Sequence, residues 1–127
     1  MKALIGVISE KRLRDRMLAI ATGKYKPSPN EPKFWFSSLI AVGQLLSNDN
    51  IELLRLMHRE KPQSVTQLAE MTGRQVSNLS ATLKSLAGRG FVVLNKKGNT
   101  VIPVAQFTDF EIQVDHEVLE VSHNKAA

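Results

Sequence analysis

The sequence contains no cysteine, and this absence excludes both disulfide bonds and thiolate metal sites. A chain without disulfides fits a reducing compartment, so we expect the protein to be cytoplasmic. No apolar run reaches the roughly 18 residues that a membrane-spanning helix needs. We therefore expect no membrane partner.

The sequence also lacks any recognisable catalytic or metal-binding pattern. Its histidines do not share metal-ligand spacing: His58, His116 and His123. No serine has a histidine and an acid in a recognisable context, and no glycine-rich phosphate loop is present. The closely spaced acids fit surface charges better than an acid/base pair: Asp49 with Glu52, and Asp109 with Glu111. We expect no enzymatic activity, no metal and no cofactor.

Acidic residues are missing from one long window. Residues 71–108 contain five Lys or Arg and no Asp or Glu, while residues 1–33 carry eight basic and three acidic residues. The acids gather elsewhere, above all in residues 109–127. This asymmetry favours a polyanionic partner, most simply nucleic acid. The alternative is a basic face without a function.

Periodicity and caps predict the order of elements. We expect a basic N-terminal helix and a proline-rich arm within residues 1–33, with the helix capped by Ser9 and ended by Gly23. Residues 34–115 then form one domain, with helices over 34–47 and 48–60, the second capped by Asn48 or Asn50, and with alternating apolar residues over 107–115 as its final strand. Residues 116–127 read as a flexible acidic tail.

Two short helices and a hairpin lie between these elements. Ser64 and Gln67 have capping-box spacing at the start of the first helix, and Gly73 is placed to end it. Ala69, Gly73 and Leu79 have the spacing of a helix-turn-helix, in which a small residue, a turn glycine and an apolar residue let two helices cross closely. A basic KKGN turn follows within a hairpin. The sequence therefore predicts a mainly α fold with a small β-hairpin wing (α+β), a winged helix-turn-helix.

The segment SVTQLAEMTGRQVSNLSATLKSLAGRGFV resembles the winged-helix module of MarR-like regulators. The resemblance is carried by Val76, Ser77, Leu83, Lys84, Leu86, Gly90 and Val92. More narrowly, the chain resembles a group of small predicted DNA-binding regulators, some of them described as antitoxins. This resemblance implies a sequence-specific, autoregulatory transcription regulator, with double-stranded DNA and a cognate toxin as partners.

The second helix of this segment offers a face suited to the major groove. Small polar side chains and an arginine lie opposite the expected buried stripe of Val76, Leu79, Leu83 and Leu86, and Asn78 can pair with an adenine edge. Our candidates for base contacts are Arg74, Gln75, Ser77, Asn78, Ala81 and Thr82. Our candidates for DNA-backbone and wing contacts are Ser64, Lys84, Ser85, Arg89, Lys96, Lys97 and Asn99.

Some apolar residues have no obvious place in this module. Trp35, Leu39, Val42 and Leu46 have helical spacing and form either a core stripe or the seam of a homodimer. The competing interpretation of the whole chain is a protein-interaction module that does not bind specific DNA. The N-terminal basic helix fits either a DNA-contacting arm or a docking element.

Overall fold

A computed structural model describes residues 1–115 and divides the chain into two compact units. Met1 and Leu45–Asp109 form the first, which we call the helix–hairpin unit. Lys2–Gln44 and the segment that starts at Phe110 form the second, which we call the sheet unit. The acidic tail expected over residues 116–127, with His116 and His123, lies outside the described residues.

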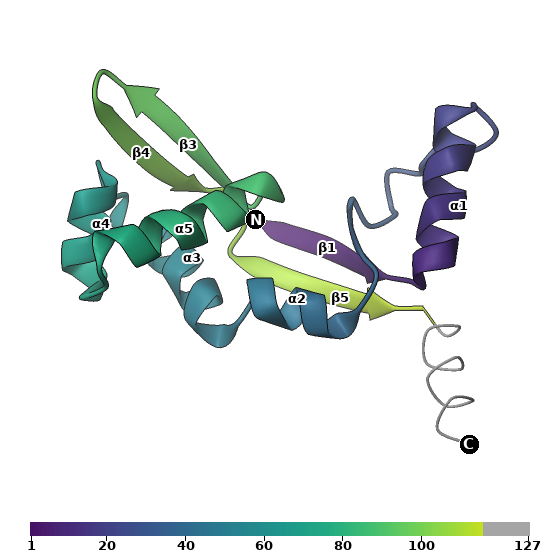
Figure 1. The fold of residues 1–127 in the computed structure, drawn as a ribbon, viewed down its shortest axis with the longest axis horizontal. Helices are drawn as coiled ribbons and strands as arrows, with labels where there is room; N and C mark the ends of the chain where they lie inside the picture. The colour runs from purple at the N-terminus through teal and green to yellow at the C-terminus, as the bar shows by residue number, and fades with distance from the viewer. Residues whose placement is uncertain (116–127) are drawn as a thin grey trace. The chain divides into compact units, whose positions relative to one another are not determined.

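The helix–hairpin unit contains three helices and a two-stranded antiparallel sheet (Figure 1). The helices are α3 (Asn48–Glu60), α4 (Val65–Thr72) and α5 (Val76–Gly88), and the strands are β3 (Val92–Lys97) and β4 (Thr100–Ala105). These elements lie where hydrophobic periodicity predicted them. The cap of α3 differs from the expectation, because the hydroxyl of Ser47 accepts a hydrogen bond from the Asn50 amide at 3.2 Å.

The turn between α4 and α5 follows from three side-chain and backbone properties. Ser64 Oγ accepts from the Gln67 amide at 2.9 Å and so satisfies an otherwise unpaired helix N–H. The Gln67 side-chain oxygen accepts a hydrogen bond from the Gln63 amide. A capping box would use the amide of the next residue, Ser64, as the donor. Gly73 ends α4 at φ +71°, a conformation that glycine adopts without a steric penalty. The chain can therefore leave α4 and enter α5 within a few residues.

Buried apolar side chains hold α5 against the rest of this unit. Leu79, Leu83 and Leu86 are almost completely buried on one side of α5, together with Leu68 of α4 and Phe91 after α5. Burying a leucine side chain contributes about 1.5–3 kcal/mol relative to leaving it exposed, so this stripe fixes which face of α5 points outward. The stripe is one residue shorter than expected, since Val76 is the first residue of the helix and is 45% exposed.

The hairpin has a two-residue turn. β3 and β4 pair from Val92 with Ala105 to Lys97 with Thr100, which leaves Gly98 and Asn99 as the loop. Gly98 takes φ +63°, whereas Asn99 does not adopt positive φ, so only the glycine is needed for the turn. The side chains of Lys96, Lys97 and Asn99 are exposed at this end of the hairpin.

The sheet unit contains a three-stranded sheet and two helices. Its elements are β1 (Lys2–Val7), α1 (Glu10–Ala21), β2 (Phe34–Phe36), α2 (Leu39–Leu45) and β5 (Asp109–Val114). The strand order is β2-β1-β5, and β1 pairs with β2 in parallel (Figure 1). Ala3, Ile5 and Val7 alternate along β1 and are buried, which gives this sheet its core.

The expected fold class is wrong. We expected a mainly α chain (α+β) with a small hairpin and one further strand over residues 107–115, but residues 1–115 form five helices and five strands in two sheets, so the mainly α assignment does not hold. The helix expected over residues 34–47 starts as strand β2, and α2 occupies only its later part. The first residues, for which we expected no element, form the central strand of the second sheet. At the start of residues 34–47, the spacing of apolar residues predicted a helix. The chain instead forms a strand there, which pairs with a segment distant in the sequence.

The proline-rich arm is held to the sheet unit by Arg16 of α1. The guanidinium of Arg16 lies 4.5 Å from the ring centroid of Trp35 and 5.2 Å from that of Tyr25. It also forms a 2.6 Å ion pair with Glu31, and its side chain is only 16% exposed. The arm therefore has defined contacts at both Tyr25 and Glu31.

No helix within residues 1–115 is long and apolar enough to cross a membrane.

Candidate nucleic-acid interface

The outward face of α5 is built from small polar side chains and one lysine. Because Leu79, Leu83 and Leu86 are buried, the residues on the other side of the helix must be exposed. The exposed candidates are Ser77, Asn78, Ala81, Lys84 and Ser85. A helix with such short side chains can approach a groove about 12 Å wide without steric conflict. Among the expected base contacts, Ser77, Asn78 and Ala81 lie together on this face.

The first turn of α5 keeps its backbone N–H groups available. Gln75 is the N-cap residue, but its side chain makes no capping hydrogen bond. Gln75 and Ser77 are both exposed at the positive end of the helix dipole, where anions are stabilised. We expected both residues to contact bases, and this position also suits contact with a phosphate.

Thr82 is less accessible than the other candidates for base contact. It is half-buried, and its hydroxyl donates to the Asn78 carbonyl oxygen at 3.1 Å. A threonine that bonds to the preceding turn of its own helix has its hydroxyl hydrogen already used. Its methyl group is the part that remains for a contact.

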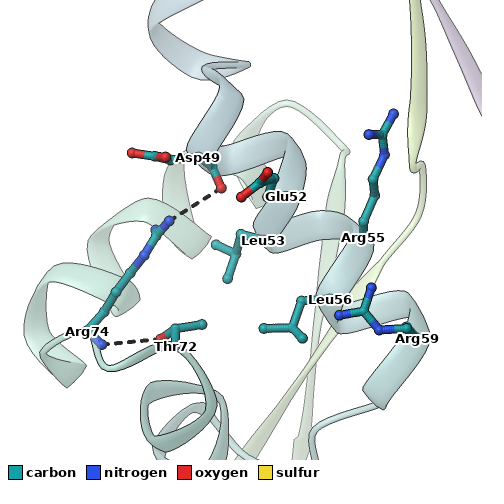
Figure 2. Close-up of a pocket in the computed structure, with 8 residues that line it drawn as sticks. All are labelled: Asp49, Glu52, Leu53, Arg55, Leu56, Arg59, Thr72 and Arg74. Atoms are coloured by element: carbon teal, nitrogen blue, oxygen red, sulfur yellow. Dashed lines mark hydrogen bonds between the residues drawn. The ribbon is translucent and has the colours of Figure 1, made fainter.

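Arg74 lies in the turn before α5 and not on the exposed face of the helix. Its guanidinium Nη2 donates to the Asp49 carbonyl oxygen at 3.3 Å, and its amide donates to Thr72 Oγ1 at 3.3 Å. Figure 2 shows the side chain directed toward α3. We expected Arg74 on the same helix face as Asn78, but helical spacing does not apply to Arg74 because α5 begins at Val76. In this conformation Arg74 is separated from the other base-contact candidates.

Lysines on α5 and the hairpin are not neutralised by acids. Within residues 1–115, Lys84, Lys96 and Lys97 have no ion pair with an Asp or Glu. On α1, by contrast, Lys11 pairs with Asp15 at 3.4 Å, and Arg12 and Arg16 pair with Asp115 and Glu31. The three lysines of α5 and the hairpin therefore supply positive charge that a polyanion can bind.

Two further candidates for backbone contact have structural roles. The hydroxyl of Ser64 caps α4, although the residue remains partly exposed. Arg89 is the residue after α5, where its amide donates to the Leu86 carbonyl oxygen at 3.3 Å, and it is exposed beside Gly90.

The expected seam is divided between the two units. Trp35 lies in strand β2, and Leu39 and Val42 lie in α2, whereas Leu46 belongs to the helix–hairpin unit. Val42 and Leu46 are buried, but Leu39 is 51% exposed. One continuous helical stripe is therefore ruled out, because a strand interrupts the expected helix.

The sequence did not identify two features of this unit. Val76 is exposed at the start of α5, next to the polar candidates. The sequence did not indicate this exposure, because the spacing of Val76 matches that of the buried stripe. Arg55 and Arg59 of α3 line the same pocket as Arg74. No signal in the sequence joins these arginines, since the pocket depends on how α3 meets the α4–α5 turn.

Comparison with known proteins assigns the chain to a family. A family model described as HVO_A0114 matches residues 45–112, which include every element of the helix–hairpin unit and most of β5. The function of that family is unknown. A search of curated proteins finds no match.

Proposed function

The chain belongs to the HVO_A0114 family, and we propose that it is a transcription regulator that binds a specific double-stranded DNA sequence. In this proposal, the exposed face of α5 enters the major groove and reads base edges through Asn78 and its neighbours. The hairpin carrying Lys96 and Lys97 contacts the phosphate backbone. The proposal rests on residues of the helix–hairpin unit alone.

One observation carries the proposal. From Met71 to Thr108, every ionisable charge on a side chain is positive, and α5 buries its apolar stripe while exposing polar groups of groove-compatible size. On a solvated helix, acids and bases three or four residues apart stabilise the helix as ion pairs, and α5 has no such pair. An exposed face with hydrogen-bonding groups, lysine and no acid suits a partner that is both negatively charged and rich in donors and acceptors. DNA has both properties.

We also propose that the protein acts as a homodimer through the sheet unit. Leu39 and Ile40 of α2 are 51% and 74% exposed, and Met17 and Leu18 of α1 are also exposed. Exposed apolar side chains in such numbers favour a protein contact. A two-fold dimer would place two α5 helices on half-sites about one DNA turn apart, which increases specificity. Autoregulation and an antitoxin role rest on family resemblance alone and are not part of this proposal.

Selection of DNA from a random pool, followed by affinity measurements at several salt concentrations, tests the proposal. We expect one enriched sequence, bound more tightly than random duplex, with an affinity that falls steeply as salt rises because phosphate contacts release counterions. Absence of enrichment together with no salt dependence would remove the DNA-binding proposal. In that case the exposed apolar residues of α1 and α2 would favour the alternative, a protein-interaction module.

A further inference from the structure

A pocket of about 490 Å³ lies in the helix–hairpin unit between α3 and the end of α4. Its size is within the range of about 300–1,000 Å³ that is usual for small-molecule sites. Figure 2 shows the side chains of Leu53 and Leu56 directed into the space, with Arg74 and Arg59 on opposite sides. The DNA contacts proposed above lie on α5 and the hairpin, and Arg74 is the one pocket residue among the base-contact candidates from the sequence.

The lining combines an apolar floor with charges of both signs. The half-buried Leu56 offers an apolar surface at the bottom of the pocket, and Leu53, which is almost completely buried, lies beside it in the lining. The carboxylate of Glu52 and the guanidinium of Arg74 lie at one end, near the start of α3 (Figure 2). A ligand that matched this lining would carry a positive group, a negative group and an apolar part.

The charged groups at that end have unused binding capacity. Within residues 1–115, Glu52 makes no ion pair or hydrogen bond through its carboxylate. Arg74 donates one side-chain bond, to the Asp49 carbonyl oxygen, and a guanidinium has five N–H donors. By contrast, Arg55 is engaged by the Thr108 carbonyl oxygen and the Asp109 carboxylate. Glu52 and Arg74 therefore form a charged pair that can receive a ligand, with the Asp49 carboxylate also on the lining.

We propose that this pocket binds a free α-amino acid with an apolar side chain. The α-carboxylate of the ligand pairs with Arg74, and its ammonium group pairs with Glu52. The apolar side chain covers Leu53 and Leu56 and gains the burial energy that a small polar ligand lacks. A simple organic anion satisfies Arg74 but repels Glu52, and a simple amine has the opposite defect. The zwitterion is the one class that satisfies both ends.

Ligand binding would also affect DNA binding, and this part alone rests on the proposed function. A carboxylate in the pocket holds the Arg74 guanidinium on α3 and away from the exposed face of α5. An arginine held there cannot contact DNA, so ligand and DNA each weaken the binding of the other by the same factor. The turn that leads into α5 thereby connects the pocket with the DNA surface.

The experiment titrates the full-length, ¹⁵N-labelled protein with three probes and follows amide shifts in α3 and the α4–α5 turn. The probes are L-leucine, 4-methylpentanoate, which lacks the amine, and 3-methylbutylamine, which lacks the carboxylate. Each is raised to about 20 mM, the weak end of the affinity scale. We expect saturable shifts at Glu52, Leu53, Leu56 and Arg74 with L-leucine, and at least about tenfold weaker binding of both other probes.

Variants locate the site and separate it from DNA binding. Glu52→Gln and Arg74→Gln should each weaken L-leucine binding at least about tenfold, while Lys84→Gln on the exposed face of α5 should leave it unchanged. Amide spectra of the variants confirm that they are folded. Absence of saturable shifts, equal binding of all three probes, or unchanged binding by both pocket variants would each overturn the site.

The coupling has its own measurement. Saturating L-leucine should raise the dissociation constant for selected DNA in the wild type but not in Arg74→Gln. If the protein bound L-leucine but no DNA, the proposed function and the coupling would both be wrong, while the amino-acid site would stand.

Discussion

Gly6 and Trp35 lie opposite each other in the parallel pair of β1 and β2, and the indole ring fills the space that a side chain at position 6 would need. A β-carbon on Gly6 would lie 2.6 Å from Cε3 and 2.9 Å from Cη2 of Trp35. The same indole also contacts Arg16, whose guanidinium lies 4.5 Å from the indole centroid. The indole therefore contacts both a bare backbone position and a cation.

Gly6→Ala is expected to lower the free energy of unfolding by about 1–3 kcal/mol, because the indole must move to admit the methyl group. Urea titration followed by tryptophan fluorescence measures this directly, since Trp35 is the single tryptophan of the chain. Gly43→Ala is the matched control: nothing lies within 4 Å of its added β-carbon in α2. It should raise the same quantity by about 0.5–1 kcal/mol. Equal stabilities for the two variants would contradict the steric argument.

Arg16→Met is expected to loosen the proline-rich arm. The cation–π contacts and the largely buried ion pair with Glu31 together contribute about 1 kcal/mol to holding this segment, so cleavage by endoproteinase Lys-C after Lys24 and Lys33 should become about three- to tenfold faster. Arg14→Met removes the same charge from the same helix at an exposed position and should not change the rate. Equal cleavage of both variants and the wild type would show that Arg16 does not restrain the arm.

Asn78→Ala is expected to weaken binding of selected DNA by about 1–3 kcal/mol and to relax the preference at one base pair. The amide is exposed on α5 and can make two hydrogen bonds to an adenine. Fluorescence anisotropy with the selected duplex and single-base variants gives both effects. Asn30→Ala, an exposed change in the arm, controls for nonspecific effects. Wild-type affinity for Asn78→Ala would mean that this face of α5 does not read bases.

Lys96→Ala combined with Lys97→Ala is expected to weaken selected and random duplexes to a similar extent. The logarithmic salt dependence should flatten by up to about two charges, because each lost phosphate contact releases about 0.9 fewer counterions. Lys24→Ala combined with Lys26→Ala changes the net charge equally within the arm and should leave the slope unchanged. A slope unaffected by the hairpin substitutions would place the hairpin away from DNA.

Leu39→Asp combined with Ile40→Asp is expected to convert a homodimer into a folded monomer. Both residues are exposed on α2, so the substitutions should not disturb the core. Light scattering coupled to size-exclusion chromatography should give twice 14.1 kDa for the wild type and 14.1 kDa for the variant. Met71→Asp, an exposed change in the helix–hairpin unit, should leave the dimer intact. A wild-type mass of 14.1 kDa at micromolar concentration would exclude a constitutive dimer.

Local signals in the sequence were sufficient for α3, α4, α5 and the hairpin. Regular spacing of apolar residues, a serine cap at Ser64, and glycines at positions 73 and 98 each have one dominant structural meaning. The exposed face of α5 followed from the same spacing, because burial of Leu79, Leu83 and Leu86 leaves a single outward direction. The resemblance to MarR-like regulators stays a prediction.

The sheet unit was not accessible to this reasoning. Trp35, Leu39 and Val42 are spaced as on a helix, yet Trp35 is in a strand because Phe34 to Phe36 pairs with Ile5 to Val7. Such pairing joins segments about thirty residues apart and leaves no periodic trace in either. The predicted position of Arg74 was wrong for a different reason. Its contact with Asp49 depends on how α3 packs against the turn, and the spacing of residues along one helix does not specify that packing.

The split of the chain determines the order in which its parts can fold. Apart from Met1, the helix–hairpin unit is one continuous segment, Leu45–Asp109, inserted between the two halves of the sheet unit. During synthesis, its contacts are complete before residues 110–114 have left the ribosome, whereas β1 must wait for those residues to gain its neighbour β5. The last step of folding is therefore the pairing of β5 with β1, after the inserted segment has already folded. A sequence interrupted upstream of β5 would leave β1 with an unpaired edge, which exposes the nascent chain to misassociation with other strands.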